Sequence, residues 1–321
     1  MSTGGPAGSA EAMAGRILVG TSSWADPGFV AEWYPPGLPA SERLGFYAER
    51  FDVVEVNATW YGLPAPAATQ RWVEQTPHGF TFDVKLHRLL TRHAAHPEDL
   101  PSDLREGVDL TPRGRIVLDE RLERTVVART LEGLEPLVQA GRLGALLLQL
   151  SPSFKPGAHR LEELDGLLEL LAPHRVAVEL RHRGWLDEER REATLGWYER
   201  HGAVWVGVDA PEGSAPTLLP ALDAVTRPEL AYLRAHGRNA KGWMTGRDVA
   251  ERFAHHYDDG ELRELTGRAE RLAEQADQVH LQFNNNRGRD APEAARRTKE
   301  LLGQDPGPPV PARDEAAHAG A

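Results

Sequence analysis

The 321-residue sequence contains no cysteine. That absence excludes disulfide bonds, thiolate metal sites and a cysteine nucleophile, and it fits a cytoplasmic protein. No run of about 18 apolar residues occurs either, so we expect no membrane span and no membrane partner. Positive charge is in short supply, since 37 Lys and Arg stand against 48 Asp and Glu, for a net charge of −11. This balance disfavours a nucleic-acid partner without excluding a local basic patch.

The two ends of the chain differ in composition from the rest. Residues 1–14 are small and polar, without the charged and then apolar pattern of a signal peptide, and residues 304–321 are rich in proline, alanine and charge. Such segments bury too little apolar surface to fold, so we expect a disordered arm and a disordered tail. The stretch between them, 15–303, has the length of one barrel domain.

Eight short apolar runs of strand length recur along the chain and are rich in β-branched and aromatic residues. They are 16–22, 52–57, 80–85, 145–150, 175–182, 203–209, 230–236 and 278–284. Amphipathic, helix-like segments lie between most of them, at 41–50, 67–75, 122–141, 159–172, 186–202 and 261–276, and another follows at 291–303. Alternation of strands and helices favours a parallel sheet, and eight strands favour its closure. The sequence therefore predicts an α/β fold, a single (β/α)8 barrel of the TIM type.

Two connections depart from this regular pattern. The sixth, 210–229, contains several prolines and predicts a loop or a single turn instead of a helix. The third, 86–121, is long and predicts an insertion after the third strand.

Side chains alternate between the two faces of a strand, and this parity separates apolar from polar residues in seven of the runs. Val54 and Val56, for example, oppose Glu55 and Asn57. The apolar face suits packing against outer helices, whereas the polar residues gather toward the C-terminal strand ends, where such barrels keep their active sites. The charged members of this predicted ring are Glu55, Lys85, Glu179, Arg181, Asp209, Arg234 and His236. Because buried charge is costly unless paired or functional, the ring is either an ion-pair network or an active site.

Residue chemistry suggests roles within the ring. Glu55 and Glu179 are acid/base candidates, a pair of the kind that hydrolyses glycosides. Lys85 and His236 are further catalytic candidates, and Lys85, at a strand end, could also form a Schiff base. The candidate substrate-binding residues, which would stabilise charge or orient hydroxyl groups, are Asn57, Tyr61, Gln149, Arg181, Asp209, Arg234, Arg238, Asn284 and Asn285.

Cofactor signals are weak. Glu55, Glu179, Asp209 and His236 offer oxygen and imidazole ligands for a divalent metal, but no HExxH or other tight ligand spacing occurs. The segment 237–242 is not a P-loop, and the absence of GxGxxG means that no nicotinamide or flavin cofactor is indicated.

Aromatic residues are frequent in the predicted loops after the strands. They are Trp24, Trp33, Tyr34, Trp60, Tyr61, Trp185 and Trp243. Such rings can stack on sugars or bases, or they can cover the barrel mouth as a small core, which is our interpretation for Trp33 and Tyr34.

Several motifs, taken together and in this order, carry a family resemblance. They are GTSSW (20–24), EWYPPGL (32–38), FDVVEVNATWYGLP (51–64), RWVEQTPHGFTFDVKLHRLLTRH (71–93), LGALLLQLSPSF (143–154), VAVELRHRGWL (176–186), AYLRAHGR (231–238) and FNNN (283–286). The succession resembles the YecE-like family, also known as domain of unknown function 72, over nearly the whole expected domain. The resemblance implies a TIM-type barrel and little about chemistry. The sequence departs from the family pattern at Gly62, where arginine is common, which puts in doubt a role for that position in binding an anion.

These observations lead to one leading hypothesis and two alternatives. The leading hypothesis is an enzyme, of hydrolase or isomerase type, that acts on a polar small molecule such as a sugar or a phosphorylated sugar by acid/base chemistry. The alternatives are a non-catalytic binding protein for a metabolite or a nucleic-acid end, and a metal-dependent isomerase or hydrolase.

Overall fold

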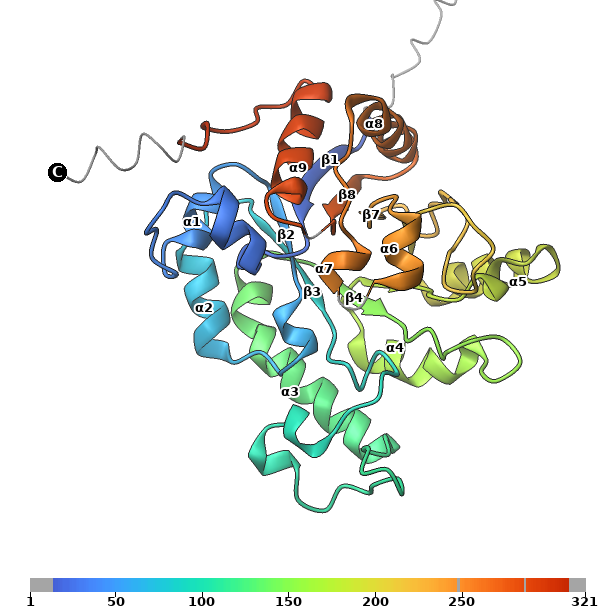
Figure 1. The fold of residues 1–321 in the computed structure, drawn as a ribbon. Coiled ribbons are helices and arrows are strands. Elements are labelled where there is room, and N and C mark those ends of the chain that lie inside the picture. The colour runs from blue at the N-terminus through green and yellow to red at the C-terminus, as the bar shows by residue number, and fades with distance from the viewer. Residues whose placement is uncertain (1–13, 247–248, 286, 312–321) are drawn as a thin grey trace, which may run out of the picture.

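The structure is a computed structural model that describes residues 14–246, 249–285 and 287–311. Eight strands form one closed parallel barrel in chain order, and the last strand pairs with the first (Figure 1). They are β1 (Arg16–Thr21), β2 (Val53–Val56), β3 (Thr81–Lys85), β4 (Leu143–Gln149), β5 (Val176–Glu179), β6 (Val204–Asp209), β7 (Ala231–Ala235) and β8 (Gln278–Phe283). The predicted single (β/α)8 barrel of the TIM type is confirmed.

Helices surround this barrel (Figure 1), and each of the seven predicted helical segments overlaps one of them. These are α1 (Arg43–Ala48), α2 (Pro66–Glu74), α3 (Glu120–Gln139), α4 (Asp165–Leu171), α5 (Glu188–His201), α8 (Asp259–Ala273) and α9 (Asp290–Leu301). Capping signals mark their ends. The Asp119 side chain accepts a hydrogen bond from the Leu122 N–H at 2.7 Å at the start of α3, and α5 ends at Gly202, whose φ is 59°.

Two short helices after β7, α6 (Ala240–Thr245) and α7 (Val249–Arg252), were not predicted. They span six and four residues, too few for an apolar repeat of helical spacing to be visible in the sequence. Their position matters because the loop after β7 lies over the C-terminal end of the barrel.

Strand register and cross-barrel hydrogen bonds show which side chains face inward. Glu55 is in register with Asp83, and Gln149 with Glu179. The hydrogen bonds that Arg234 of β7 makes to Glu55 and Glu179 cross the interior. Residues of this parity point inward on β2, β3, β4, β5, β7 and β8, as predicted. Their neighbours of opposite parity, such as Val54 and Leu233, are fully buried between the barrel and its surroundings.

On strand β6 the inward and outward faces are the opposite of those predicted. Val208 is in register with Arg234 and therefore faces the interior, which leaves Asp209 facing outward. There Asp209 accepts a hydrogen bond from Arg268 of α8 at 3.3 Å. The prediction that Asp209 belongs to the inner ring is wrong, because both faces of β6 are buried and alternation alone does not reveal which of them is inside.

The two irregular connections behave as predicted. Residues 210–229, all of which are described, contain no helix, and Thr226 ties them to β6 by accepting from the Trp205 N–H at 2.9 Å. The insertion after β3 lies outside the barrel, beside the first turns of α3 (Figure 1). Ion pairs join the two, between Asp103 and Arg129 at 2.8 Å and between Arg92 and Glu123 at 2.5 Å.

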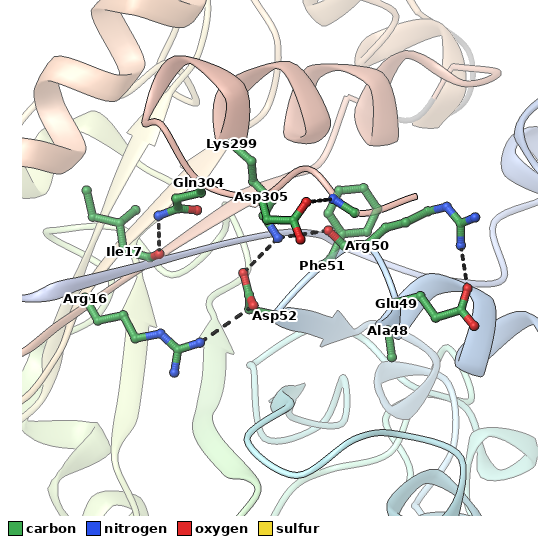
Figure 2. Close-up of a pocket in the computed structure, with 11 residues that line it drawn as sticks. Arg16, Ile17, Ala48, Glu49, Arg50, Phe51, Asp52, Lys299, Gln304 and Asp305 are labelled. Carbon is green, nitrogen blue, oxygen red and sulfur yellow. Dashed lines mark hydrogen bonds and ion pairs between the residues drawn. The ribbon is translucent and has the colours of Figure 1, made fainter. Parts of the chain in front are cut away.

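At the N-terminal end of the barrel, α9 and the residues after it close against β1 and the start of β2 (Figure 2). Lys299 Nζ lies 3.1 Å from an Asp52 carboxylate oxygen and donates to the Arg50 carbonyl at 3.0 Å. Gln304 Nε2 donates to the Ile17 carbonyl at 2.9 Å. The packed chain thus continues past residue 303, where we placed the start of a disordered tail. Residues 1–13 and 312–321, which make up most of the predicted arm and tail, lie outside the described residues.

Candidate active site at the C-terminal end of the barrel

The inside of the barrel is organised around Arg234, whose side chain is 1% exposed. Its Nε donates to Glu55 Oε2 at 2.8 Å, and its Nη2 donates to Glu55 Oε1 at 2.5 Å. Its Nη1 donates to Glu179 Oε2 at 2.5 Å. Burial alone would lower the pKa of Arg234, but the two carboxylates raise it above its ordinary value. One guanidinium therefore bridges carboxylates from β2 and β5.

Glu179 is surrounded by donors. Besides Arg234, its Oε1 accepts from Gln149 Nε2 at 2.8 Å, and it lies 3.1 Å from His236 Nε2 and 3.4 Å from Arg181 Nη1. Burial alone would raise the pKa of Glu179, but Arg234, His236 and Arg181 hold it well below its usual range. Glu179 is consequently a fixed negative charge and carries no proton to donate.

His236 lies between Glu179 and Asn284. Its Nδ1 is 2.9 Å from Asn284 Nδ2, which can only donate, so Nε2 carries the ring proton and donates it to Glu179. Burial lowers the pKa of His236 to about 4, because Glu179 opposes this effect only in part and the nearby Arg234 adds to it. The imidazole is therefore neutral near pH 7, with both nitrogens hydrogen-bonded.

A second layer of polar side chains lies deeper in the barrel. Asp83 accepts hydrogen bonds from His280 Nδ1 at 2.9 Å and from Gln282 Nε2 at 3.0 Å. Tyr232 donates its hydroxyl to Glu55 Oε2 at 3.0 Å, and burial raises the pKa of that hydroxyl well above 10. We did not single out these residues from the sequence, although parity already placed them on the polar face. They support the upper layer, and the side chains of Asp83 and His280 are 0% exposed.

Lys85 is the ring residue that can exchange a proton near neutral pH. Its Nζ donates to Gln149 Oε1 at 2.8 Å and lies 5.4 Å from the centre of the Trp60 ring. The residue is partly exposed, whereas Glu55 and Glu179 are fully buried. Burial and the charge of Arg234 lower the pKa of Lys85 to about 7. Near neutral pH this amine is therefore available both as a base and as an acid.

Positive charge accumulates around Lys85. The Arg88 guanidinium lies 4.6 Å from the centre of the Trp60 ring, and the Arg181 guanidinium lies 5.3 Å from that of Trp243. The pKa of His93 is lowered to about 4. Burial contributes most to this shift, and the positive charges of Lys85, Arg181 and Arg88 add to it. The sequence prediction did not include Arg88 or His93, whose loop positions gave no parity signal.

On the neighbouring strands β8, β1 and β2, three buried polar atoms have no hydrogen-bond partner among the described residues. They are Gln282 Oε1, Ser22 Oγ and Asn57 Oδ1. Asn57 Nδ2 is occupied, because it donates to the Ser22 carbonyl at 2.7 Å. Buried polar atoms are almost always paired in native proteins, so each of these three needs a partner, which a water or a bound hydroxyl group would supply. Ser22 and Gln282 were absent from the predicted set.

Four predicted binding residues lie apart from this centre. Asp209 and Arg238 pair with each other at 2.9 Å on the outer side of β6 and β7. Asn285 Nδ2 donates to the His255 carbonyl at 2.9 Å, and Tyr61 is 64% exposed at the rim. Trp33 and Tyr34 are buried core residues, as we had interpreted them.

The two specific chemistries that we considered for the carboxylates do not match this geometry. For a glycosidase pair, one carboxyl group must be protonated, yet Arg234 and Tyr232 occupy both oxygens of Glu55, and Glu179 is a fixed anion. A metal site would require its four candidate ligands to converge on one point, namely Glu55, Glu179, Asp209 and His236. Arg234 instead lies between the two glutamates, and Asp209 points outward. Within the described ranges, no three His, Asp or Glu residues are grouped as metal ligands would be.

No helix in the described part of the chain combines the length and the apolar character needed to cross a bilayer.

Comparison with known proteins gives consistent matches along most of the chain. Residues 18–317 match the family model described as "Protein of unknown function DUF72". The chain is 28% identical over 293 residues to UPF0759 protein YunF of Bacillus subtilis (strain 168), covering 89% of this chain and 94% of YunF. It is 30% identical over 184 residues to UPF0759 protein YecE of Escherichia coli (strain K12), covering 56% of this chain and 53% of YecE.

Solved structures of DUF72 family proteins share the fold. The protein from Thermotoga maritima MSB8 superposes with a TM-score of 0.71 at 28% identity, covering 90% of this chain and 100% of that one. The protein from Enterococcus faecalis V583 gives a TM-score of 0.71 at 24% identity, covering 90% and 98%.

Proposed function

Since this chain belongs to the DUF72 family, as its motifs predicted, and the family name assigns no activity, we propose a function from the site itself. The protein is an enzyme that acts on a polar, anionic small molecule such as a phosphorylated sugar, and the Lys85 amine is its proton-transfer group. The observation that carries this proposal is the position of Lys85. It is a partly exposed residue whose amine has a pKa of about 7, set beside buried charges that are already paired with one another.

A proton-transfer group works best when its pKa lies near the working pH, because both protonation states are then populated. Lys85 meets this condition, whereas Glu179 and His236 are held in one state each. The neutral Nζ would take a proton from a substrate hydroxyl group or from a carbon next to a carbonyl, and the resulting ammonium would return it at the next step. We assign Glu55, Glu179 and Arg234 as positioning residues, with Arg234 also lowering the pKa of Lys85.

The charge at the mouth favours an anionic substrate. Lys85 and Arg181 are near enough to lower the pKa of the same histidine, and Arg181 keeps part of its side chain exposed. A guanidinium can bind a phosphate or carboxylate with two parallel hydrogen bonds. Arg181 would hold the anionic group while the substrate extends over Lys85.

The unpaired atoms on β8, β1 and β2 favour a substrate that carries hydroxyl groups. Asn57 Oδ1 and Gln282 Oε1 can only accept hydrogen bonds, and the Ser22 hydroxyl can donate or accept. A polyol would satisfy these atoms, whereas an apolar ligand would leave them buried without partners.

A two-stage experiment tests this function. Sugars, sugar phosphates and small carboxylates are first screened by thermal shift, and we expect phosphorylated sugars to stabilise the protein more than their neutral parents do. Each stabilising compound is then incubated with the protein and followed by NMR. We expect conversion by the wild type and a loss of at least about 100-fold in rate for Lys85→Met. Lys155→Met, the same substitution at an exposed loop lysine, should leave the rate unchanged.

Two results would overturn the proposal. The first is conversion by Lys85→Met at the wild-type rate. The second is stabilisation by short oligonucleotides alone, lost steeply as salt is added, because that would favour the alternative of a nucleic-acid binding protein.

A further inference from the structure

A large cavity lies outside the barrel mouth, beside β6. It has a volume of about 960 Å³ and is bounded by residues 210–213 and 219–221 on one side and by α8 on the other. A helix would normally cover this part of a TIM-type barrel, but the sixth connection has none. The missing helix thus leaves a cleft of the size that small ligands occupy.

The α8 wall of this cleft is rich in arginine. Arg263, Gly267 and Arg271 follow one another at a spacing of four, so they share one face of the helix, and all three line the cleft. Gly267 leaves the helix surface bare between the two arginines. A Cβ at this position would lie 3.4 Å from Arg271 Nη1, so the Arg271 guanidinium bends back over the glycine.

Five arginines line the cleft, and three of them are already paired with carboxylates, among them Arg263 with Asp259 at 3.2 Å. Arg268 and Arg238 form the floor of the cleft, and each is paired with Asp209, at 3.3 Å and 2.9 Å respectively. Arg183 and Arg271 form no ion pair within the described ranges, and the Arg183 guanidinium donates to the Gly213 carbonyl at 2.7 Å. Five arginines and three carboxylates, Asp209, Glu212 and Glu264, line the cleft, so its lining carries a formal excess of two positive charges, although the whole chain has a net charge of −11.

The opposite wall is partly apolar. Pro211, Leu219 and Pro220 line it. Val208, Ala210 and Leu219 also line a small cavity whose lining includes Glu179 and His236, so the cleft adjoins the inner network. A ligand in the cleft would find charge on one side and apolar surface on the other.

We propose that this cleft is a second ligand site, separate from the barrel mouth, that binds a phosphate-bearing small molecule. Its phosphoryl oxygens accept hydrogen bonds from Arg183 and Arg271, and its organic part packs on Leu219 and Pro220. Gly267 gives the phosphate access to the helix surface, and Arg268 remains the fixed floor.

Pyrophosphate is a suitable probe because it carries the charge without the organic part. Binding is measured by isothermal titration calorimetry at low salt with the full chain. We expect Arg183→Ala/Arg271→Ala to weaken the binding by at least about tenfold, since each removed group makes charge-assisted hydrogen bonds. The matched control is Arg113→Ala/Arg115→Ala, which removes two exposed arginines of the third connection that do not line the cleft.

A second variant tests the same site without changing its charge. Gly267→Leu places a side chain in the cleft, and a helix tolerates leucine better than glycine, so we expect weaker binding with no loss of thermal stability. The proposal is overturned if the control pair weakens binding as much as the cleft pair, or if neither cleft variant weakens it. It is also overturned if the wild type does not bind the probe, or if only Lys85→Met abolishes binding, because that would place the anion at the mouth.

Discussion

Arg234 and Glu55 face each other across the barrel and share two parallel hydrogen bonds, of 2.8 Å and 2.5 Å, although 179 positions separate them in the sequence. Neither side chain is more than 1% exposed. The third donor position of the same guanidinium is taken by Glu179. The pair is thus the centre of a network that ties together β2, β5 and β7.

Replacing Arg234 should destabilise the protein more than any exposed substitution. Arg234→Met leaves two buried carboxylates without their shared counter-ion, and we expect the free energy of unfolding to fall by about 3–5 kcal/mol. Urea denaturation measures this loss. Arg190→Met, which breaks an exposed pair with Asp187, should cost less than about 1 kcal/mol. Equal losses for the two variants would contradict a structural role for the bridge.

Lys85 should be distinguishable from the other lysines by its titration. The chain contains four, Lys85, Lys155, Lys241 and Lys299. With lysine labelled by ¹³C at Cε, we expect the Lys85 resonance to titrate near pH 7, well below the value of about 10.4 for lysine in model peptides. Lys85→Arg identifies the resonance by removing it. A Lys85 midpoint at the model-peptide value would contradict the lowered pKa and, with it, the proposed proton-transfer role.

The same shift has a consequence for stability. Between pH 7 and about 10.4, the unfolded chain holds a proton on Lys85 that the folded chain has released. The folded state is therefore favoured progressively as pH rises through this window, and Lys85→Met should remove that contribution.

Lowering the pH should destabilise the folded protein through the protonation of His236. Its pKa is about 4 in the fold and 6.5 ordinarily, so the unfolded chain binds a proton between these values that the folded chain does not. Stability therefore falls as pH drops from 6.5 to 4, by at most about 1.4 kcal/mol per pH unit for this one group. His236→Gln should show a shallower decline than the wild type in unfolding experiments across this range. Parallel declines would mean that other groups account for the whole effect.

The contacts of residues 304–311 predict where the chain can be shortened. Beyond Gln304, whose side chain donates to the Ile17 carbonyl (Figure 2), Arg50 donates to the Pro309 carbonyl at 3.4 Å and Arg296 to the Pro308 carbonyl at 3.2 Å. A chain that ends at residue 303 should lose about 1–3 kcal/mol of stability in urea denaturation, because Arg50 and Arg296 lose these acceptors and the Ile17 carbonyl loses its donor. A chain that ends at residue 311 should match the full chain. If both truncated chains match it, the observed packing contributes nothing measurable.

Strand positions and most strand faces were predictable because their signals are local. A short apolar run marks a strand wherever it lies, and a charged residue opposite two valines, as at Glu55, leaves one sensible assignment of faces. The face of β6 was not predictable in this way. Val208 points inward and Asp209 outward because of the register with β7, and the outward carboxylate is paired by arginines from α8 and from the loop after β7.

The residues alone were enough to establish the barrel, the end of it that carries polar side chains, and the membership of Glu55, Lys85, Glu179, Arg234 and His236 in one inner ring. These conclusions follow from alternation and from the shared direction of parallel strands, which are properties of neighbours in the chain. The pairing within the ring required the folded barrel, because the distance between β2, β5 and β7 is set by closure and stagger, which no local pattern encodes. That pairing commits Glu55, Glu179 and Arg234 to one another, and it leaves Lys85, with a pKa of about 7, as the ring residue able to exchange a proton near neutral pH.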